Sequence, residues 1–122
     1  MTLDELIANI QKRDRRSIAR AITTIENDYP ETAQMLRMLG KSQGRAYRVG
    51  ITGPPGAGKS TLTSELTKKL RAMDKTVAVI AVDPTSPFTG GALLGDRIRM
   101  QEISMDPGVY VRSMATRGSL GG

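Results

Sequence analysis

The residues with the clearest chemical potential form one short run, GPPGAGKST, at positions 53–61. Its spacing matches the pattern GxxxxGK[ST] through Gly53, Gly58, Lys59 and Ser60. In such a loop the backbone N–H groups turn toward an anion and the lysine ammonium reaches the outer phosphate oxygens. The serine hydroxyl is then placed to coordinate Mg²⁺ that bridges the phosphates. The run therefore predicts a site for a nucleoside phosphate and a divalent cation.

The remaining residues of the loop suit the same purpose. Glycines at 53, 56 and 58 can adopt positive φ angles without a clash at Cβ, which lets successive N–H groups face inward. Pro54 and Pro55 fix φ on the outer limb and stiffen it. A helix that begins near Lys59 would add the positive end of its dipole.

Two acidic residues after the loop are candidates for the metal site. Asp83 follows an apolar run, so it would stand at the carboxyl end of a strand, where open α/β sheets bind ligands. The alternative is a simple Asp-Pro turn, but the position at a strand end favours the functional role. Asp96 precedes the segment RIRMQEIS and could be the N-cap of a helix there.

The elements that must position these residues follow from periodicity. Runs rich in β-branched residues predict strands at 47–52, 76–83 and 109–114, the last introduced by the turn sequence DPG. Helical spacing of leucines predicts a helix over 59–73, and 96–104 could supply another. Strand, helix and strand in this order predict a βαβ unit with parallel strands and hence an α/β fold.

Residues 1–40 predict three short amphipathic helices instead. Their apolar stripes run from Leu3 to Ile10, from Ile18 to Ile25 and from Thr32 to Leu39. Thr2 with Glu5 forms a capping-box pattern, Asp14 is a possible N-cap, and Gly40 is a natural stop.

Composition excludes several classes of protein. The 122 residues include no cysteine and no histidine, which rules out disulfides, thiolate metal sites and Ser/His or Cys/His catalysis. The net charge of +6 is spread evenly, with nine basic and six acidic residues on each side of Val49, and aromatics make up only 3%. We therefore expect neither nucleic acid nor membrane as a partner. The N-terminus lacks the features of a signal or transit peptide, which predicts a cytoplasmic or matrix-like location.

Four strings carry a more specific signal: GITGPPGAGKSTL (50–62), VIAVDPTSP (79–87), GALLGDRIRM (91–100) and VYVRSMATRGSLGG (109–122). Together they resemble consecutive signatures of the GTPase chaperones of adenosylcobalamin-dependent methylmalonyl-CoA mutase. Some members of that family are described as lysine/arginine/ornithine transport system kinases or ATPases. The loop alone also resembles adenylate-type kinases. The string VDPTSP, followed thirteen residues after its Asp by the Asp of GDRIRM, is much more specific.

The resemblance implies a P-loop NTPase of the signal-recognition-like branch with a parallel sheet. It also implies a homodimeric, Mg²⁺-dependent enzyme that binds GTP and GDP and gates cobalamin loading of the mutase. The residues that it places at the GTP phosphates are Gly53, Pro54, Pro55, Gly56, Ala57, Gly58, Lys59, Ser60 and Thr61. Lys59 would act in catalysis at the outer phosphates, and Ser60, Asp83 and Asp96 would serve the metal. Arg112 and Arg117 match a family stretch near the nucleotide, but no role follows for them.

The resemblance also sets the expected domain organisation, with a helical extension over 1–43 and the first part of a P-loop GTPase domain over 44–122. Family members continue into an acidic Walker B segment and a guanine-reading Asn-Lys-x-Asp motif, neither of which occurs here. The sequence is thus interpreted as an incomplete domain, whose own activity stays open.

Two other functions remain open. In a small P-loop kinase or ATPase, Asp83 would contact a phosphoryl acceptor, and transfer of γ-phosphate to a small molecule would identify it. In a partner-binding module without catalysis, the contact surface would be a basic cluster at the first helix junction. That cluster comprises Lys12, Arg13, Arg15, Arg16 and Arg20. Charge patterning favours solvated charges at a helix junction over a contact surface as the explanation of the cluster.

Overall fold

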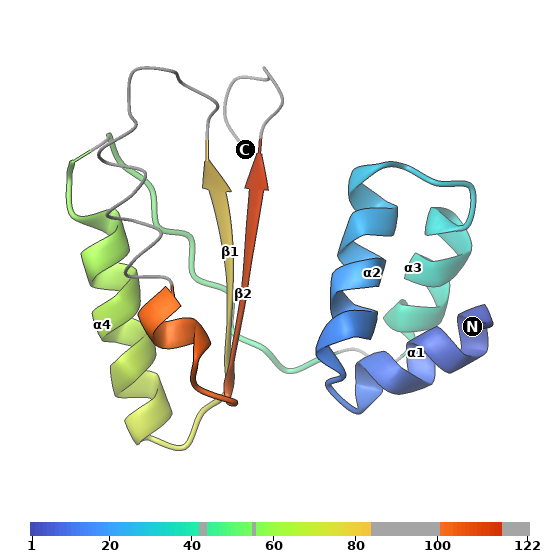
Figure 1. Ribbon diagram of the computed structural model, residues 1–122, viewed down its shortest axis with the longest axis horizontal. Coiled ribbons are helices and arrows are strands. Elements are labelled where there is room, and N and C mark those ends of the chain that lie inside the picture. Colours follow the sequence, from blue (N-terminus) through green and yellow to red (C-terminus); the bar gives the residue numbers. More distant parts are fainter. Residues whose placement is uncertain (42–43, 55, 84–100, 116–122) are drawn as a thin grey trace. The chain divides into compact units, whose positions relative to one another are not determined.

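The computed structural model describes four stretches of the chain: residues 1–41, 44–54, 56–83 and 101–115. They divide into two compact units, Met1–Arg48 and Val49–Gly122, which are described separately. The first unit is helical, and the second contains helix and parallel strands (Figure 1). None of the helices in the described stretches is both long and apolar enough to cross a membrane.

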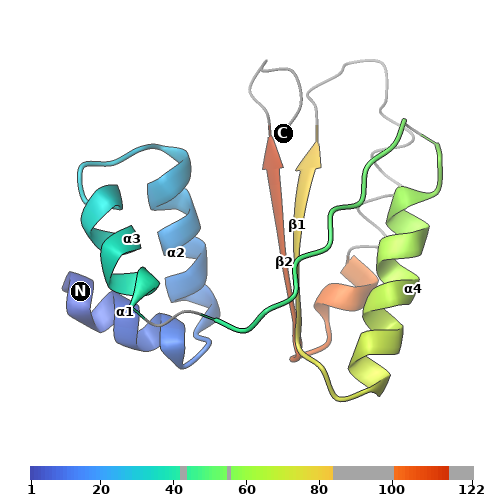
Figure 2. The same ribbon diagram turned by 180° about the vertical axis from the view of Figure 1, so that it is seen from behind.

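The helical unit consists of α1 (Leu3–Gln11), α2 (Arg15–Glu26) and α3 (Thr32–Gly40) (Figure 2). All three helices predicted from the sequence are therefore confirmed. The capping box before α1 is also confirmed, since the Glu5 N–H donates to Thr2 Oγ1 (3.2 Å) and the Thr2 N–H to Glu5 Oε2 (2.9 Å). Two donors at the helix start are thereby satisfied.

The sequence predicted the start of α2 correctly, but it did not predict the end of α3 correctly. Asp14 caps α2 as predicted, because its Oδ2 accepts from the Ser17 N–H (3.1 Å) and the Ser17 hydroxyl (2.6 Å). These bonds hold the pKa of the Asp14 carboxyl below its ordinary value, with a smaller contribution from Arg16. Gly40 was predicted to stop α3, but it is itself the last helical residue, and Lys41 is the C-cap.

The core of this unit is small and aliphatic. Leu6, Ile7, Ala21 and Met35 are buried, and Met35 has no exposed surface. The partly buried side chains around them are Leu3, Ile10, Met38 and Leu39. The predicted stripes are only partly buried, because Ile25 of α2 and Leu36 of α3 are 42% and 48% exposed. In the described part of the unit the core contains no aromatic side chain, as the composition predicts.

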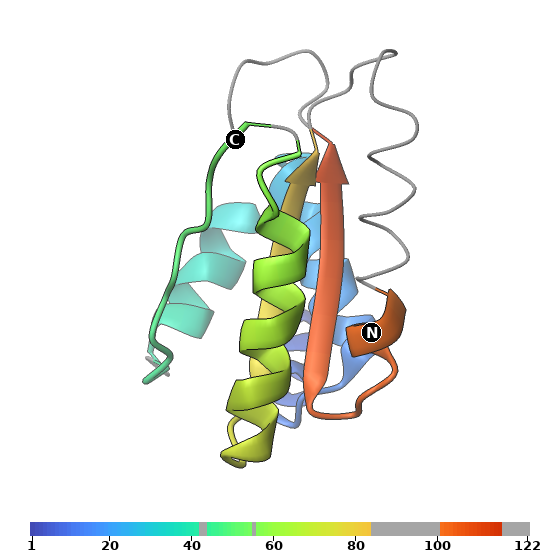
Figure 3. The same ribbon diagram turned by 90° about the vertical axis from the view of Figure 1, so that its left-hand side faces the viewer.

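In the second unit, α4 (Lys59–Ala72) is followed by two parallel strands, β1 (Val77–Asp83) and β2 (Val109–Ala115). The register pairs Val77 with Val109 and Asp83 with Ala115. Figure 3 shows α4 running along one face of the two-stranded sheet. The helix and the parallel strands agree with the predicted α/β class.

The prediction of a strand at 47–52 is wrong: residues 44–54 contain neither helix nor strand. Tyr47 is 91% exposed and Val49 59% exposed. Strand structure requires a hydrogen-bonded neighbour, and in the described part of the chain β1 and β2 pair only with each other. A run of β-branched residues is therefore not enough on its own to make a strand.

The most deeply buried face of helix α4 is not the one that its leucines suggest. In the stripe of apolar residues at helical spacing, Leu66 and Leu70 are half-buried, whereas Leu62 and Met73 are exposed (57% and 65%). Ser64 and Thr67 are only 3% exposed each. Ser64 and Thr67 are three residues apart and lie on one side of the helix. Their small side chains allow the helix to pack closely against the rest of the unit.

Residues 101–104 are helical and appear as the short turn beside α4 in Figure 1, and the rest of the predicted helix over 96–104 lies outside the described residues. The DPG turn before β2 is confirmed by a bond from the Val109 N–H to the Asp106 carbonyl (3.0 Å). Asp106 Oδ1 also accepts from the Gly108 N–H (2.8 Å).

Candidate phosphate-binding loop

The glycine-rich loop adopts the backbone conformation that its glycines permit. Gly56 and Gly58 have φ angles of +79° and +91°. A Cβ atom at either position would have open space around it, so conformation and not crowding requires glycine there. The Ala57 N–H donates to the Pro54 carbonyl (3.2 Å), which closes a turn inside the loop.

Gly58 is the N-cap of α4 and supplies no side chain to cap it. The first intrahelical bond runs from the Leu62 N–H to the Gly58 carbonyl (2.9 Å). The N–H groups of the first helical turn have no acceptor within a helix. They stand at the positive end of the helix dipole, where anions are stabilised.

Lys59 lies at this helix start and turns back over the loop. Its Nζ donates to the Gly53 carbonyl oxygen at 2.6 Å, so the ammonium is held at the loop. The side chain is half-buried. Because an ammonium has three donors, this bond leaves capacity for further oxygen acceptors such as phosphate.

The first turn of α4 also places the two hydroxyl residues of the motif. Ser60 is half-buried and Thr61 is exposed. The turn is reinforced by the Thr63 hydroxyl, which donates to the Lys59 carbonyl (2.8 Å). The serine is thus one residue beyond the lysine on a fixed helical turn, as a metal-binding role would require.

Of the two acidic candidates for the metal site, Asp83 lies within the described residues and Asp96 does not. Asp83 is the last residue of β1, and the parallel register places it beside Ala115 at the shared carboxyl edge of the sheet. Asp96, Pro55 and Arg117 lie outside the described residues. Arg112 lies on β2, in register with Ile80. The described residues contain no group of three or more acidic side chains that could hold a metal ion.

The far end of α4 is anchored by contacts that sequence reasoning missed. Arg71 Nε lies 3.0 Å from Asp106 Oδ2, and Arg71 Nη1 donates to the Lys75 carbonyl (2.9 Å). Lys68 Nζ lies 2.8 Å from Glu102 Oε1. The hydrogen bonds to Asp106 and to Glu102 raise the pKa values of Arg71 and Lys68, respectively.

Gly108 belongs to the same contact, because a Cβ there would overlap the Arg71 guanidinium. The DPG turn was the available sequence signal for this anchor. It gave no indication of which basic residue would meet the turn.

These features define an α/β protein with a glycine-rich loop of the P-loop type. A loop with positive-φ glycines, a helix start without a side-chain cap and a lysine folded over the loop all fit a phosphate group.

Comparison with known families agrees with this class. Residues 18–122 match the family model described as methylmalonyl Co-A mutase-associated GTPase MeaB. The chain belongs to this family, as the resemblance of its sequence signatures predicts.

The most similar relatives include proteins named as GTPases. The chain is 62% identical over 120 residues to a Pyrococcus abyssi protein provisionally named a GTPase, covering 98% of this chain and 37% of that protein. It is 38% identical over 125 residues to GTPase ArgK of Escherichia coli, covering 99% of this chain and 38% of that protein.

A mouse protein named methylmalonic aciduria type A homolog, mitochondrial, is 41% identical over 134 residues, covering 98% of this chain and 32% of that protein. The chain therefore spans about a third of the length of these curated relatives.

Proposed function

We propose that this chain is the phosphate-binding part of a Mg²⁺-dependent GTPase that acts as a chaperone of adenosylcobalamin-dependent methylmalonyl-CoA mutase. The observation that carries the proposal is the loop at 53–61, in which positive-φ glycines lead into α4 and Lys59 folds over Gly53. The family description, which names both a GTPase and an association with the mutase, supports the choice of base and partner.

The proposal gives separate roles to the loop backbone, to Lys59 and to the residues that serve the metal. The backbone N–H groups of the loop and of the first turn of α4 hold the phosphates, and Lys59 neutralises charge on the outer ones. Ser60, Asp83 and Asp96 serve the Mg²⁺ ion, directly or through water. Mg²⁺ would supply further neutralisation of the phosphate oxygens when bound.

The proposed partner is the mutase, whose cobalamin loading and protection would depend on the nucleotide state. A homodimer and a cytoplasmic location complete the proposal for the whole protein. The names of the relatives support the GTPase activity more directly than they support the partner.

Calorimetric titration of the chain within its full-length protein tests the nucleotide proposal, because the guanine-reading motif of the family does not occur in these 122 residues. We expect GDP to bind in the presence of Mg²⁺, to bind more weakly in EDTA, and to bind more tightly than ADP. Circular dichroism first establishes that the chain is folded. ADP binding that equals or exceeds GDP binding would count against the GTPase and in favour of an ATPase or kinase.

The partner proposal needs a separate measurement. We expect the chain within its full-length protein to co-elute with a purified mutase on a sizing column, with a nucleotide-dependent retention volume. Absence of co-elution with every nucleotide state would remove the chaperone role and leave the GTPase proposal standing.

A further inference from the structure

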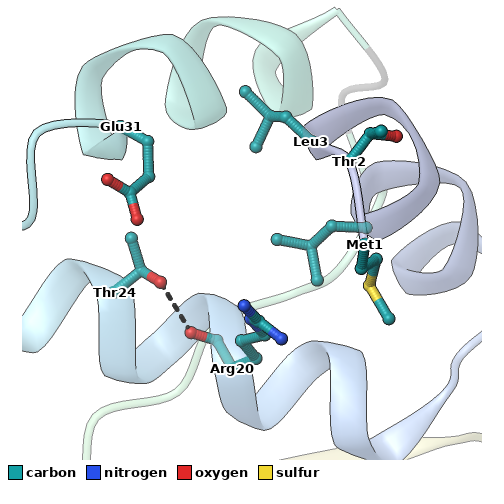
Figure 4. A pocket seen from close by; sticks show the side chains of 7 residues that line it. Met1, Thr2, Leu3, Arg20, Thr24 and Glu31 are labelled. Carbon is teal, nitrogen blue, oxygen red and sulfur yellow. Dashed lines mark hydrogen bonds between the residues drawn. The ribbon is translucent and has the colours of Figure 1, made fainter.

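A pocket of about 230 Å³ opens in the helical unit, away from the phosphate loop in sequence (Figure 4). It lies where the start of α1, the middle of α2 and the residue before α3 meet. Its lining includes Thr2, Leu3, Leu6, Arg20, Thr24 and Glu31. Nothing in the proposed GTPase function uses this pocket.

Hydrogen bonds fix the walls of the pocket in place. The capping box of Thr2 and Glu5 sets the start of α1. The Thr32 hydroxyl donates to the Thr24 carbonyl (3.1 Å), which ties the start of α3 to α2. Because these contacts are made by the protein itself, the pocket is largely preformed.

The lining of the pocket is mixed: Met1, Leu3 and Leu6 provide an apolar part, and the other four residues are polar or charged. Leu6 is 7% exposed and belongs to the core of the unit, and Leu3 is half-buried beside it. Thr24 contributes its methyl group, because its hydroxyl donates to the Arg20 carbonyl (2.9 Å), as Figure 4 shows. A leucine-sized side chain would contact the apolar part of this lining.

The rim is charged and asymmetric. Arg20 borders the pocket on the α2 side and Glu31 on the α3 side, both are exposed, and no ion pair joins them within residues 1–41. A carboxylate would be attracted to one side and repelled by the other. The rim therefore orients a charged ligand.

Arg20 also continues into a larger basic surface. Arg16 lies one turn earlier on the same face of α2, and Lys12 and Arg13 stand in the turn before the helix. All four are exposed, and none forms an ion pair with another residue of the described stretches. Asp14 is the only acid among them, and its carboxylate is engaged by Ser17. We call Lys12, Arg13, Arg16 and Arg20 the α2 basic surface.

We propose that the pocket and the α2 basic surface together bind a segment of a partner protein that carries one leucine-sized apolar side chain next to aspartate or glutamate. The apolar side chain fills the pocket, and the acidic neighbours pair with Arg16 and Arg20. Arginine suits this role, because its guanidinium can hold a carboxylate through two parallel hydrogen bonds.

Other ligand classes fit the site less well. Small-molecule and cofactor sites commonly enclose about 300–1,000 Å³. The volume of this pocket, about 230 Å³, is smaller. A single-stranded nucleic acid would need aromatic side chains for stacking, and the pocket lining contains none. The apolar part of the lining, formed by Met1, Leu3 and Leu6, would contribute nothing to a ligand recognised through phosphates alone.

Selection from a displayed library of random 12-residue peptides on the full chain tests the proposal. We expect enrichment of sequences with one leucine, isoleucine or methionine flanked by acidic residues. A fluorescein-labelled peptide of that pattern should then bind with saturable anisotropy, and replacing its apolar residue by serine should weaken binding at least tenfold.

Variants of the chain assign the binding to this surface. Arg16→Glu with Arg20→Glu should weaken peptide binding at least tenfold, and Glu31→Gln should strengthen it, because it removes repulsion at the rim. Arg37→Glu is the matched control, since Arg37 is an exposed arginine on α3 and should leave binding unchanged.

Several results would overturn the proposal. These are no enrichment, enrichment of peptides without the apolar residue, and an equal effect of Arg37→Glu. Competition by a 12-nucleotide single-stranded DNA at the same concentration would also overturn it, since it would show a purely electrostatic surface. The peptide substitutions keep the test decisive even if the double arginine variant fails to fold.

Discussion

The ammonium of Lys59 lies 2.6 Å from the carbonyl oxygen of Gly53, so the last part of the glycine-rich loop is bonded to its first residue. This contact closes the loop around its own backbone and fixes the position of the charge. In the sequence, Gly53 and Lys59 are related only by a spacing of six residues, and the structure adds the hydrogen bond between them. The loop is thus held together by the same side chain that we propose contacts the phosphates.

Replacing Lys59 by alanine should weaken nucleotide binding more than it changes folding. A hydrogen bond to a charged group contributes about 1.5–3 kcal/mol, which corresponds to about a tenfold loss or more in affinity. Calorimetry with GDP and Mg²⁺ measures the loss. Lys69→Ala is the matched control, because Lys69 is an exposed lysine on the same helix. Equal losses in both variants would show that Lys59 acts only through general charge.

The same substitution at two glycines should have opposite effects on stability. Gly58 has a φ of +91° with open space at Cβ, so Gly58→Ala should destabilise the unit by about 1–3 kcal/mol through backbone strain. Gly40 is helical and also has open space, so Gly40→Ala should stabilise α3 by about 0.5–1 kcal/mol. Denaturant titration measures both changes. A stabilised Gly58→Ala would mean that the loop does not require the left-handed conformation.

The Asp14 cap should make the stability of α2 depend on pH. Its pKa is lowered in the folded chain, so the stabilisation is fully present above the unfolded value of about 4 and is lost as pH falls through the folded value. Asp14→Ala should therefore lower the thermal midpoint at neutral pH, with a difference from the natural chain that narrows at acid pH.

Asp14→Asn serves as the control for charge, because asparagine caps helices about as well as aspartate. It should retain most of the midpoint at neutral pH and lack this component of the pH dependence. A constant difference between Asp14→Ala and the natural chain at all pH values would exclude the carboxylate as the source.

Local signals predicted the helical unit well. The helix starts are marked by capping residues, namely Thr2 with Glu5 and Asp14. Their hydrogen bonds span three residues, so they form without contacts from distant parts of the chain. The positive-φ glycines of the loop at 53–58 were predicted for the same reason, since they act within one short segment. Phosphate binding by this loop stays a prediction.

Features that depend on distant partners were harder to predict. The run at 47–52 has the composition of a strand but no hydrogen-bonded neighbour in the described part of the chain, so propensity alone misled. On α4 the leucine spacing favoured a stripe that includes Leu62, yet the structure buries Ser64 and Thr67. Which helix face is buried depends on the tertiary neighbours of the helix, and helical periodicity alone does not identify them.

The contact between Arg71 and Gly108 should show itself as a non-additive pair of substitutions. A Cβ at position 108 would overlap the guanidinium that is bonded to Asp106 and to the Lys75 carbonyl, so Gly108→Ala should cost about 1–3 kcal/mol of stability. In the Arg71→Ala background the overlap is gone, and the same Gly108→Ala change should cost much less. Denaturant unfolding of the four proteins of this double-mutant cycle gives the coupling energy. If Gly108→Ala has the same cost in both backgrounds, the requirement for glycine comes from the turn itself and not from the arginine that packs against it.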